Sequence, residues 1–527
     1  MVNVLLISTY ELGRQPFGLA SPAAWLREAG ATVTCLDLAV QQLDAAAVAA
    51  AGLVAVYVPM HTATRLAATL LPRVRRINPR AHLCCYGLYA PLNASYLRGL
   101  GADTILGGEF EEGLVALAGR LSFLPGTPPD TADPSGSIPA MVLQGQANSA
   151  HTAMVLQGQA IGAHNHDARD RVRLDADAPR GYDGDGLEVR APRRAFGTQP
   201  EPLISLGKQR FRVPSREGLP GLEEYAHLTL GDGERRTVGY TEATRGCARL
   251  CRHCPIPPIY GGRFRVVQPE VVLEDIARQV AAGARHITFG DPDFFNGPTH
   301  ALRIVAGLRE RFPGLTYDAT IKIEHLLKHA RLLSTLRDTG CLFVTSAVEA
   351  VDDATLTAYD KRHTRADFIH VVALCREVGL TLNPTFVTFG PWTTLDSYVD
   401  LLALIGQLDL VDAVAPIQYG IRLLIPAGSL LLDLPEVRGL VGPYDAEALA
   451  YPWAHPDPRV DQLCADVLAA VQREQKRGKG RREIYREVWA LAQGARGLSE
   501  RAALALLQIT PTPPDATAPH LSEPWYC

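Results

Sequence analysis

The chain has 527 residues, of which 47% are apolar and 20% are charged, a composition that supports large folded cores and excludes a wholly disordered protein. Lysine and arginine total 52 against 56 aspartates and glutamates, so the net charge is −4. This balance gives no overall basic surface for a nucleic acid or an anionic membrane, and we expect neither as a partner.

The chain begins MVNVLLISTY, without the basic segment of a signal peptide. The longest apolar run, Ala45–Met60, is shorter than the ~18–20 residues of a membrane span. The ten cysteines are too few for a disulfide scaffold in a chain of this length. We therefore expect a cytoplasmic protein with reduced thiols.

Residues 1–124 alternate short apolar strands with helical stretches such as Ser21–Ala29. The expected strands are Val4–Ile7, Val33–Leu36, Leu53–Val58, His82–Tyr86 and Thr104–Leu106. Continuous apolar strands separated by helices are typical of a parallel sheet covered on both faces. The pattern predicts an α/β domain of the doubly wound, Rossmann-like kind, in which ligands bind at the carboxyl ends of the strands.

Residues 125–200 lose this alternation. They begin with turn-forming residues, carry the octapeptide AMVLQGQA at 140–147 and again at 153–160, and continue in Asp- and Arg-rich sequence. Two copies are too few for a repeat fold. We interpret the segment as a low-complexity linker with poor order.

Alternation returns in residues 201–425, with helical patterns at Glu270–Ala282, His325–Asp338 and Arg365–Val378. The expected strands are Thr237–Ala243, His286–Phe289, Tyr317–Ile323, Leu342–Val348, Leu382–Phe389 and Ala413–Tyr419. Six strand–helix units predict a partial (βα)6 barrel of the TIM type. Residues 426–527 are proline-rich at first and then helical over Val460–Gly497, which predicts a helical accessory region followed by a tail.

A cysteine cluster follows the first expected barrel strand, where Thr244-Arg245-Gly246 leads into Cys247, Cys251 and Cys254. Three thiolates on one short loop suit a soft metal centre. A structural zinc needs four ligands, and His253 is adjacent to Cys254, so it is poorly placed to be the fourth. A cubane iron–sulfur cluster held by three cysteines keeps one iron open for a ligand. The spacing favours iron–sulfur over zinc or a plain thiol loop.

The CxxxCxxC motif after the first strand of a βα barrel resembles the radical S-adenosylmethionine (radical SAM) enzymes. The domain before it, and the joint FRVPSR at 211–216, are similar to their cobalamin-binding subgroup. The resemblance covers residues 1–124 and 201–425. It implies a [4Fe–4S] cluster, S-adenosylmethionine bound at the open iron, a small-molecule substrate, and an electron donor of the flavodoxin or ferredoxin type.

The resemblance also implies roles for residues at the strand ends. Gly290, Asp291 and Asp293 follow the second strand, where the family binds the methionyl amino group, and Glu349 ends the fourth, where it binds the ribose. Lys361 follows. The family carries an aromatic residue near the adenine just before the third cysteine, and here His253 takes that position. The alternative for each polar residue is simple capping of a barrel strand.

Cobalamin binding by residues 1–124 is a further expectation. The motif Asp-x-His-x-x-Gly, whose histidine ligates cobalt in many cobalamin domains, is absent from these residues. Members of the subgroup without it hold cobalamin with its own base detached. The strand-end crevice would then be lined by Ser8, Thr9, Gly13, Pro59, His61, Gly87, Gly107 and Gly108. The alternative is a degenerate domain that binds nothing.

The sequence ends Leu521-Ser522-Glu523-Pro524-Trp525-Tyr526-Cys527. A small group of these enzymes ends in Cys-Cys-Ala-Glu-Pro, or with selenocysteine second, and this tail resembles theirs as far as the first of those residues. We expect the reading frame to continue past a selenocysteine codon. Cys527 is a candidate soft ligand or hydrogen donor for the active site, and an inert terminus is the alternative.

Together these features predict a transferase that cleaves S-adenosylmethionine and moves an alkyl group, most simply methyl, to a small molecule. A second interpretation takes the tail as evidence of arsenic metabolism, in which a 3-amino-3-carboxypropyl group is transferred to arsenic. A third is a non-catalytic corrinoid or metal carrier, because fold alone does not fix function.

Overall fold

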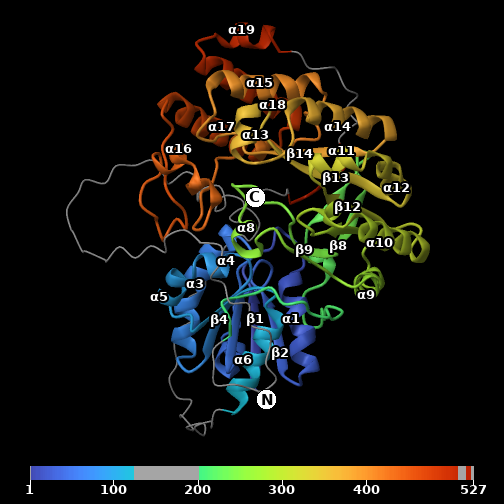
Figure 1. The fold of residues 1–527 in the computed structure, drawn as a ribbon, viewed down its shortest axis with the longest axis vertical. Coiled ribbons are helices and arrows are strands. Elements are labelled where there is room, and N and C mark those ends of the chain that lie inside the picture. The colour runs from blue at the N-terminus through green and yellow to red at the C-terminus, as the bar shows by residue number, and fades with distance from the viewer. Residues whose placement is uncertain (1, 124–200, 508–517, 524–527) are drawn as a thin grey trace, which may run out of the picture.

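The computed structural model describes residues 2–123, 201–507 and 518–523. A front domain built from the N-terminal residues lies below a half-barrel, and helices from the C-terminal region cover the far side of that half-barrel (Figure 1). Within the described residues, no helix combines the length and apolar character needed to cross a membrane. The expected linker at 125–200 and Cys527 lie outside the described residues.

The front domain is a parallel sheet in the order β2-β1-β3-β4-β5-β6. Its strands are β1 (Asn3–Ser8), β2 (Thr32–Asp37), β3 (Leu53–Tyr57), β4 (His82–Tyr86), β5 (Thr104–Gly108) and β6 (Ile204–Ser205). Its helices are α1 (Phe17–Glu28), α2 (Ala45–Ala50), α3 (His61–Ile77), α4 (Tyr89–Leu92), α5 (Ala94–Gly99) and α6 (Glu111–Phe123).

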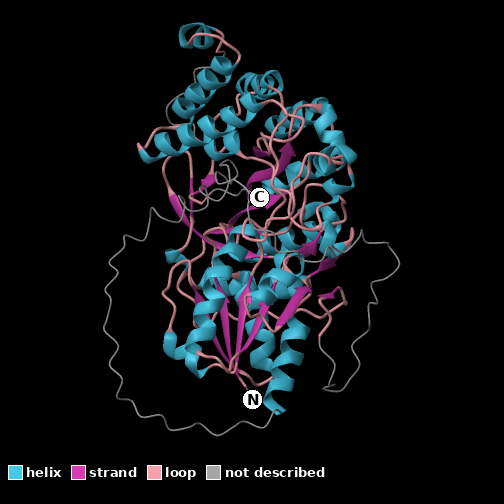
Figure 2. Ribbon diagram, turned by 90° about the vertical axis from the view of Figure 1, so that its left-hand side faces the viewer, coloured by secondary structure: helices cyan, strands magenta, loops and turns pink. Residues whose placement is uncertain are grey.

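Two separate apolar cores show why this sheet is covered on both faces. Residues of α1 and α6 pack with one set of strand side chains, and residues of α2, α3 and α5 pack with the other. Figure 2 shows the fan of strands between these two layers of helices. The doubly wound architecture is thus confirmed. The strand order reverses between β1 and β3, which is where such sheets open a crevice at their carboxyl edge.

The second sheet has the order β14-β13-β12-β11-β8-β7-β15 and curls into a half-barrel. Strands β8, β11, β12, β13 and β14 pair in parallel, while β7 and β15 are antiparallel additions at one edge. Its strands are β7 (His227–Thr229), β8 (Arg235–Thr241), β11 (His286–Phe289), β12 (Thr316–Thr320), β13 (Cys341–Glu349), β14 (Thr381–Phe386) and β15 (His520–Leu521).

Helices cover the outer face of this sheet. They are α9 (Pro269–Ala281), α10 (Pro298–Arg311), α11 (Ile323–Lys328), α12 (Leu333–Asp338), α13 (Asp353–Ala358), α14 (Arg365–Val378) and α15 (Leu395–Gln407). A small hairpin of β9 (Thr244–Gly246) and β10 (Phe264–Val266), with α8 (Pro257–Tyr260) between them, surrounds the cysteine loop. Alternation of strands and helices is therefore as the sequence predicts.

Two of the expected barrel elements are wrong in detail. The sixth strand at 413–419 is absent, and Pro416–Gly420 form the 3-10 helix η4 instead, because Pro416 lacks the N–H that a ladder needs and favours a helical first turn. The expected single helix at 325–338 is divided into α11, a 3-10 turn at Ala330–Leu332, and α12. Five parallel strands, not six, therefore form the half-barrel.

The C-terminal region adds α16 (Pro435–Arg438), α17 (Pro458–Lys476), α18 (Arg481–Ala495) and α19 (Glu500–Ala505). Apolar side chains of α17 and α18 join the core of the half-barrel. The chain then returns as residues 518–523, here called the C-terminal strap. Its strand β15 pairs with β7 at one edge of the sheet, and the Pro519 carbonyl accepts a bond of 3.1 Å from Asn383 Nδ2 of β14 at the other. The strap thus bridges the open side of the half-barrel.

Candidate active site between the two α/β domains

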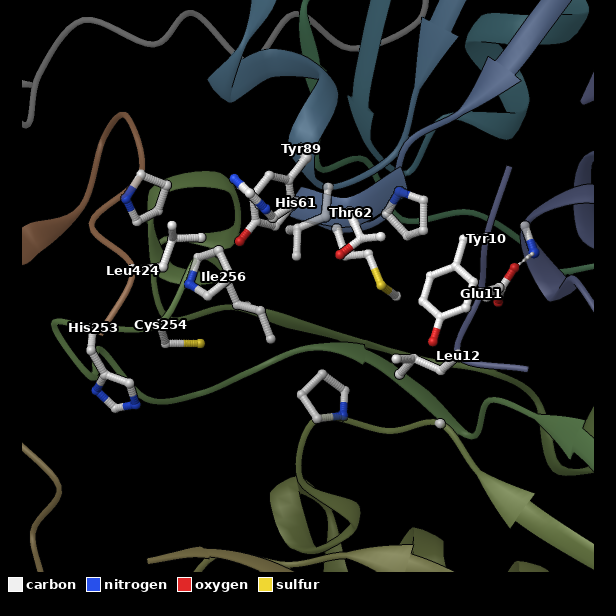
Figure 3. Close-up of a pocket in the computed structure, with 18 of the residues that line it drawn as sticks. Tyr10, Glu11, Leu12, His61, Thr62, Tyr89, His253, Cys254, Ile256 and Leu424 are labelled. Atoms are coloured by element: carbon white, nitrogen blue, oxygen red, sulfur yellow. Dashed lines mark hydrogen bonds between the residues drawn. The ribbon is translucent and has the colours of Figure 1, made fainter. Parts of the chain in front are cut away.

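A cavity of about 790 Å³ lies between the carboxyl edge of the front sheet and the mouth of the half-barrel. Figure 3 shows Tyr89 and His61 of the front domain facing Ile256 and Cys254 of the half-barrel, with Tyr10, Glu11 and Leu12 further along the same cavity. Both walls are built from residues that follow parallel strands, where side chains and backbone amides of several strands converge.

The front wall contains some of the residues predicted from the sequence. His61 and Gly108 line the cavity, whereas Ser8, Thr9 and Gly107 are not among its lining residues. Gly108 has φ +69°, and a Cβ there would lie 2.2 Å from the Ser205 carbonyl oxygen, so only glycine fits. His61 Nε2 lies 2.7 Å from the Ala448 carbonyl oxygen and must donate to it. Burial lowers the pKa of His61, which favours the neutral imidazole.

All three of the clustered cysteines are free thiols. Cys247 and Cys251 are buried, while Cys254 is half-buried and lines the cavity. Burial raises the pKa of Cys247 to about 11, so its thiol needs a cation or a metal to deprotonate. Lys322 Nζ supplies such a cation, 3.3 Å from Cys251 Sγ.

No three His, Cys, Asp or Glu side chains in the described parts of the chain form a ready metal-binding group. The three cysteines fit a soft iron–sulfur centre by the chemistry of their donors and their position on one loop.

A buried ion pair lies beside the cysteine loop. Glu349 Oε1 accepts a bond of 3.2 Å from Lys361 Nζ and lies 3.1 Å from His253 Nε2. Although burial alone would raise it, the charges of Lys361 and His253 hold the pKa of Glu349 at about 2. Glu349 has φ +72°, a strained conformation for a residue with a side chain, at a register shift of β13. Strain of this kind gathers at functional sites.

His253 occupies the place expected for an aromatic residue. Its ring centroid lies 4.6 Å from that of Tyr359 at an angle of 39°, and it lines the cavity. Burial lowers the pKa of His253. The structure therefore brings His253, Glu349 and Lys361 together, with His253 on the cavity wall.

Of the three predicted site residues that follow β11, two lie on the cavity wall and one does not. Gly290 and Asp291 line the cavity, and a Cβ on Gly290 would lie 1.8 Å from the Tyr240 hydroxyl oxygen. The Asp291 carboxylate accepts bonds from the Ala243 amide (2.9 Å) and the Thr244 hydroxyl (2.5 Å), and so holds the start of the cysteine loop. Burial raises its pKa to about 7. Asp293 is fully buried and lies 2.6 Å from His325 Nδ1, away from the cavity lining.

An interdomain cluster was not foreseen from the sequence. Arg245 is buried and lies 2.6 Å from Glu111 Oε1 and 3.4 Å from Glu109 Oε2 of the front domain, and 2.7 Å from Glu242 Oε2 of its own. Its guanidinium also stacks over the rings of Phe17, Phe110 and Phe211. The sequence shows Glu109 and Glu111 after Gly108 and Arg245 before Cys247, but nothing in it predicts that they are in contact.

Residues 241–405 match the family model described as the radical SAM superfamily. Over 243 residues the chain is 26% identical to a tRNA-2-methylthio-N(6)-dimethylallyladenosine synthase of Desulfosudis oleivorans, which covers 44% of this chain and 51% of that protein. The chain thus spans about half the length of this curated relative.

Two solved structures share the fold. The radical S-adenosylmethionine methyltransferase TsrM from Kitasatospora setae, with tryptophan and a SAM analogue bound, has a TM-score of 0.58 at 18% identity, covering 89% of both chains. The cobalamin-dependent radical enzyme OxsB, with aqua-cobalamin and S-adenosylmethionine bound, has a TM-score of 0.59 at 14% identity, covering 88% of this chain and 66% of that one.

Proposed function

From the radical SAM domain that residues 241–405 form, we propose that the protein is a cobalamin-dependent enzyme that cleaves S-adenosylmethionine and methylates a small molecule. One observation carries the proposal. A single cavity joins the strand-end crevice of the front domain to Cys254, His253 and Gly290 of the half-barrel. A methyl carrier in the crevice and a sulfonium donor at the barrel mouth would then face the same enclosed space, which proximity catalysis requires.

Cys247, Cys251 and Cys254 would hold the cluster. When bound, a [4Fe–4S] cluster with one open iron supplies an electron and a chelation point for the amino and carboxylate groups of S-adenosylmethionine. Lys322 and Lys361 place positive charge near these thiols and so favour their deprotonated form. Gly290 leaves space at the wall where a side chain would collide with Tyr240.

The side chains around bound S-adenosylmethionine would have distinct tasks. Asp291 holds the loop start through Ala243 and Thr244, and its raised pKa of about 7 lets it keep a proton in the closed site. Glu349 orients His253 through Nε2, which fixes the imidazole plane available for stacking on adenine. Lys361 compensates the Glu349 charge and keeps this support rigid.

The front domain would hold cobalamin without a histidine ligand. His61 donates through Nε2 to the Ala448 carbonyl, which keeps that nitrogen away from a bound metal. Gly108 allows the chain to approach a flat ring system closely, as glycines at such strand ends do. The structures of TsrM and OxsB, which share this fold, contain cobalamin, and this supports cobalamin as a ligand of this protein.

The proposal is tested by anaerobic reconstitution with iron, sulfide and hydroxocobalamin, followed by reduction in the presence of S-adenosylmethionine. We expect bound iron and cobalamin, with formation of S-adenosylhomocysteine, 5′-deoxyadenosine or both. Cys251→Ser should lose the iron, whereas Cys375→Ser, a buried thiol in α14, should retain it. Methylthioadenosine as the product, or intact S-adenosylmethionine with a loaded protein, would contradict methyl transfer.

A further inference from the structure

The interior of the half-barrel, below the mouth, carries polar side chains on three neighbouring strands. Thr288 of β11, Asp318 and Thr320 of β12, and Thr345 of β13 all line the cavity. The strand register sets Thr288 beside Asp318 and Thr320 beside Thr345. Because β12 runs towards the mouth, Asp318 lies one layer deeper than Thr320. The inner end of the cavity thus carries a carboxylate with the Thr288 hydroxyl beside it and the Thr320 and Thr345 hydroxyls one layer nearer the mouth.

Asp318 is held by one of its two oxygens. Its Oδ2 accepts a bond of 2.6 Å from the Thr288 hydroxyl and lies 3.0 Å from Nε2 of the fully buried His286. Both of these contacts end on Oδ2, which leaves Oδ1 as an acceptor towards the cavity. The carboxyl group is therefore fixed in orientation before any ligand arrives.

The cationic partner that the described residues offer Asp318 is His286, whose ring is charged only when it is protonated. Asp318 is only 4% exposed, and no lysine or arginine of the described segments forms an ion pair with it. A buried carboxylate is stable when a partner of opposite charge or several hydrogen-bond donors surround it. A hydrogen-bond donor on a ligand would therefore stabilise the Asp318 carboxylate.

A second acceptor without a donor lies on the same face of the sheet, next to the cavity lining. Asn383 of β14 is in register with Thr345, so their side chains share the inner face of the sheet. Its Nδ2 donates to the Pro519 carbonyl of the C-terminal strap, but its Oδ1 is buried and has no hydrogen-bond partner among the described residues. Asn383 Oδ1 is thus, like Asp318 Oδ1, an acceptor oxygen that a ligand could supply with a donor.

We propose that the interior of the half-barrel binds the ammonium group of the substrate, with Asp318 Oδ1 as the anchor. An ammonium offers three donors, of which one would meet Asp318 and the others the threonine hydroxyls. The substrate class is therefore small molecules with a primary amine. The inference rests on the proposed function, because it identifies the substrate of that same cavity.

The test uses the anaerobically reconstituted holoenzyme and pairs of amines with their N-acetyl counterparts. The probes are propylamine, phenethylamine, tryptamine and L-tryptophan, and binding is measured by saturation-transfer NMR. At least one amine should bind about tenfold or more tightly than its acetylated counterpart, the range expected of a hydrogen-bonded charge. Binding by none of the amines, or equal binding of both forms, overturns the proposal without any variant being needed.

The same comparison is made with the variant Asp318→Asn, which keeps the shape of the side chain and removes its charge. It should lose the preference for the amine, while Asp103→Asn, in an ion pair of 2.9 Å with Arg75 on the front domain, should keep it. Unchanged preference in Asp318→Asn overturns the anchor. Iron content and binding of S-adenosylmethionine are measured on the same samples. Amine binding that depends on Asp318 without cleavage of S-adenosylmethionine would contradict the proposed function alone.

Discussion

Glu11 illustrates how a single side chain on the cavity wall can carry an unusual protonation state. It lies just after β1, is buried, and contacts the Gly18 amide at 3.4 Å. Burial, and then the nearby charge of Glu242, raises the pKa of Glu11 from 4.5 to about 8. The folded protein therefore binds this proton more tightly than the unfolded chain does. The resulting stabilisation is complete below pH 4.5 and is lost as the pH rises through 8.

Replacing Glu11 with glutamine should change the pH dependence of stability. Because glutamine does not titrate, the variant should gain stability relative to the wild type between pH 5 and 8, by up to ~1.4 kcal/mol per pH unit. Thermal unfolding of the metal-free proteins across this range measures the difference. The exposed Glu310→Gln serves as control. Parallel curves for wild type and Glu11→Gln would show that Glu11 is ionised in the folded state.

The pair of Glu349 and Lys361 makes a second residue-scale prediction. Glu349→Gln leaves a buried ammonium without its carboxylate, and loss of one partner of a buried pair costs about 3–5 kcal/mol. Removing both charges in Glu349→Gln with Lys361→Met should cost less than the sum of the single changes. Denaturant unfolding of the four proteins in this cycle provides the coupling. Strict additivity would mean that the two charges do not stabilise each other.

At the scale of elements, the C-terminal strap has a role larger than its length. Strand β15 has two residues, yet Leu521 joins an apolar cluster with Leu228, Val238 and Phe343 and also lines the cavity. The Ser522 amide donates to the His227 carbonyl at 2.8 Å, and the Tyr10 hydroxyl donates to Glu523 at 2.6 Å. The strap therefore connects β7 with the front domain across the cavity wall.

Deletion of residues 518–527 should expose the edge of β7 and open the cavity to solvent. We expect faster amide hydrogen exchange in His227–Thr229, because their antiparallel partner is gone, and little change in the front strand β4. Tyr10→Phe removes the Glu523 bond but keeps β15, so it should leave exchange in β7 nearly unchanged. Equal exchange in the deleted and intact proteins would mean that the strap does not cover this edge.

The elements also show what the sequence could and could not predict. Continuous apolar runs such as Leu53–Val58 and His82–Tyr86 identify central parallel strands, because burial on both faces leaves a clear pattern. The strand expected at 413–419 fails because its apolar residues are compatible with the turn that Pro416 favours. Strand β15 carries no pattern, since a two-residue strand is defined by its partner alone.

The residues of the candidate site also include some that the sequence could predict and some that it could not. The cysteine motif was recognisable because its three cysteines lie within eight positions of one loop. Asp318 was overlooked, since a strand sequence alone does not reveal whether an alternating face points to the barrel interior or to the covering helices. Asp293 was expected near the methionyl group because of its position after β11, but its carboxylate lies against His325. Local sequence identifies strand ends, while side-chain partners depend on the fold.

For the whole molecule, the cavity exists only because two α/β domains face each other, and Arg245 lies at their junction. It meets Glu109 and Glu111 of the front domain and Glu242 of the half-barrel side. These three carboxylates raise the pKa of Arg245 against the effect of burial, so it stays charged. Burial raises the pKa of Glu109 to about 7 even with the arginine present. The interface thus depends on one cation balancing several acids.

Arg245→Met should therefore loosen the domains in a way that depends on pH. Without the guanidinium, the buried carboxylates must either take up protons or repel one another, so the cost should be about 3–5 kcal/mol near pH 8 and smaller near pH 6, where protonation is easier. Calorimetry should show one transition separating into two at pH 8. Arg278→Met, which removes the exposed pair with Glu274 on α9, should cost about 0–1 kcal/mol at either pH. An Arg245→Met protein as stable as Arg278→Met at pH 8 would show that apolar contacts alone hold the two walls of the cavity together.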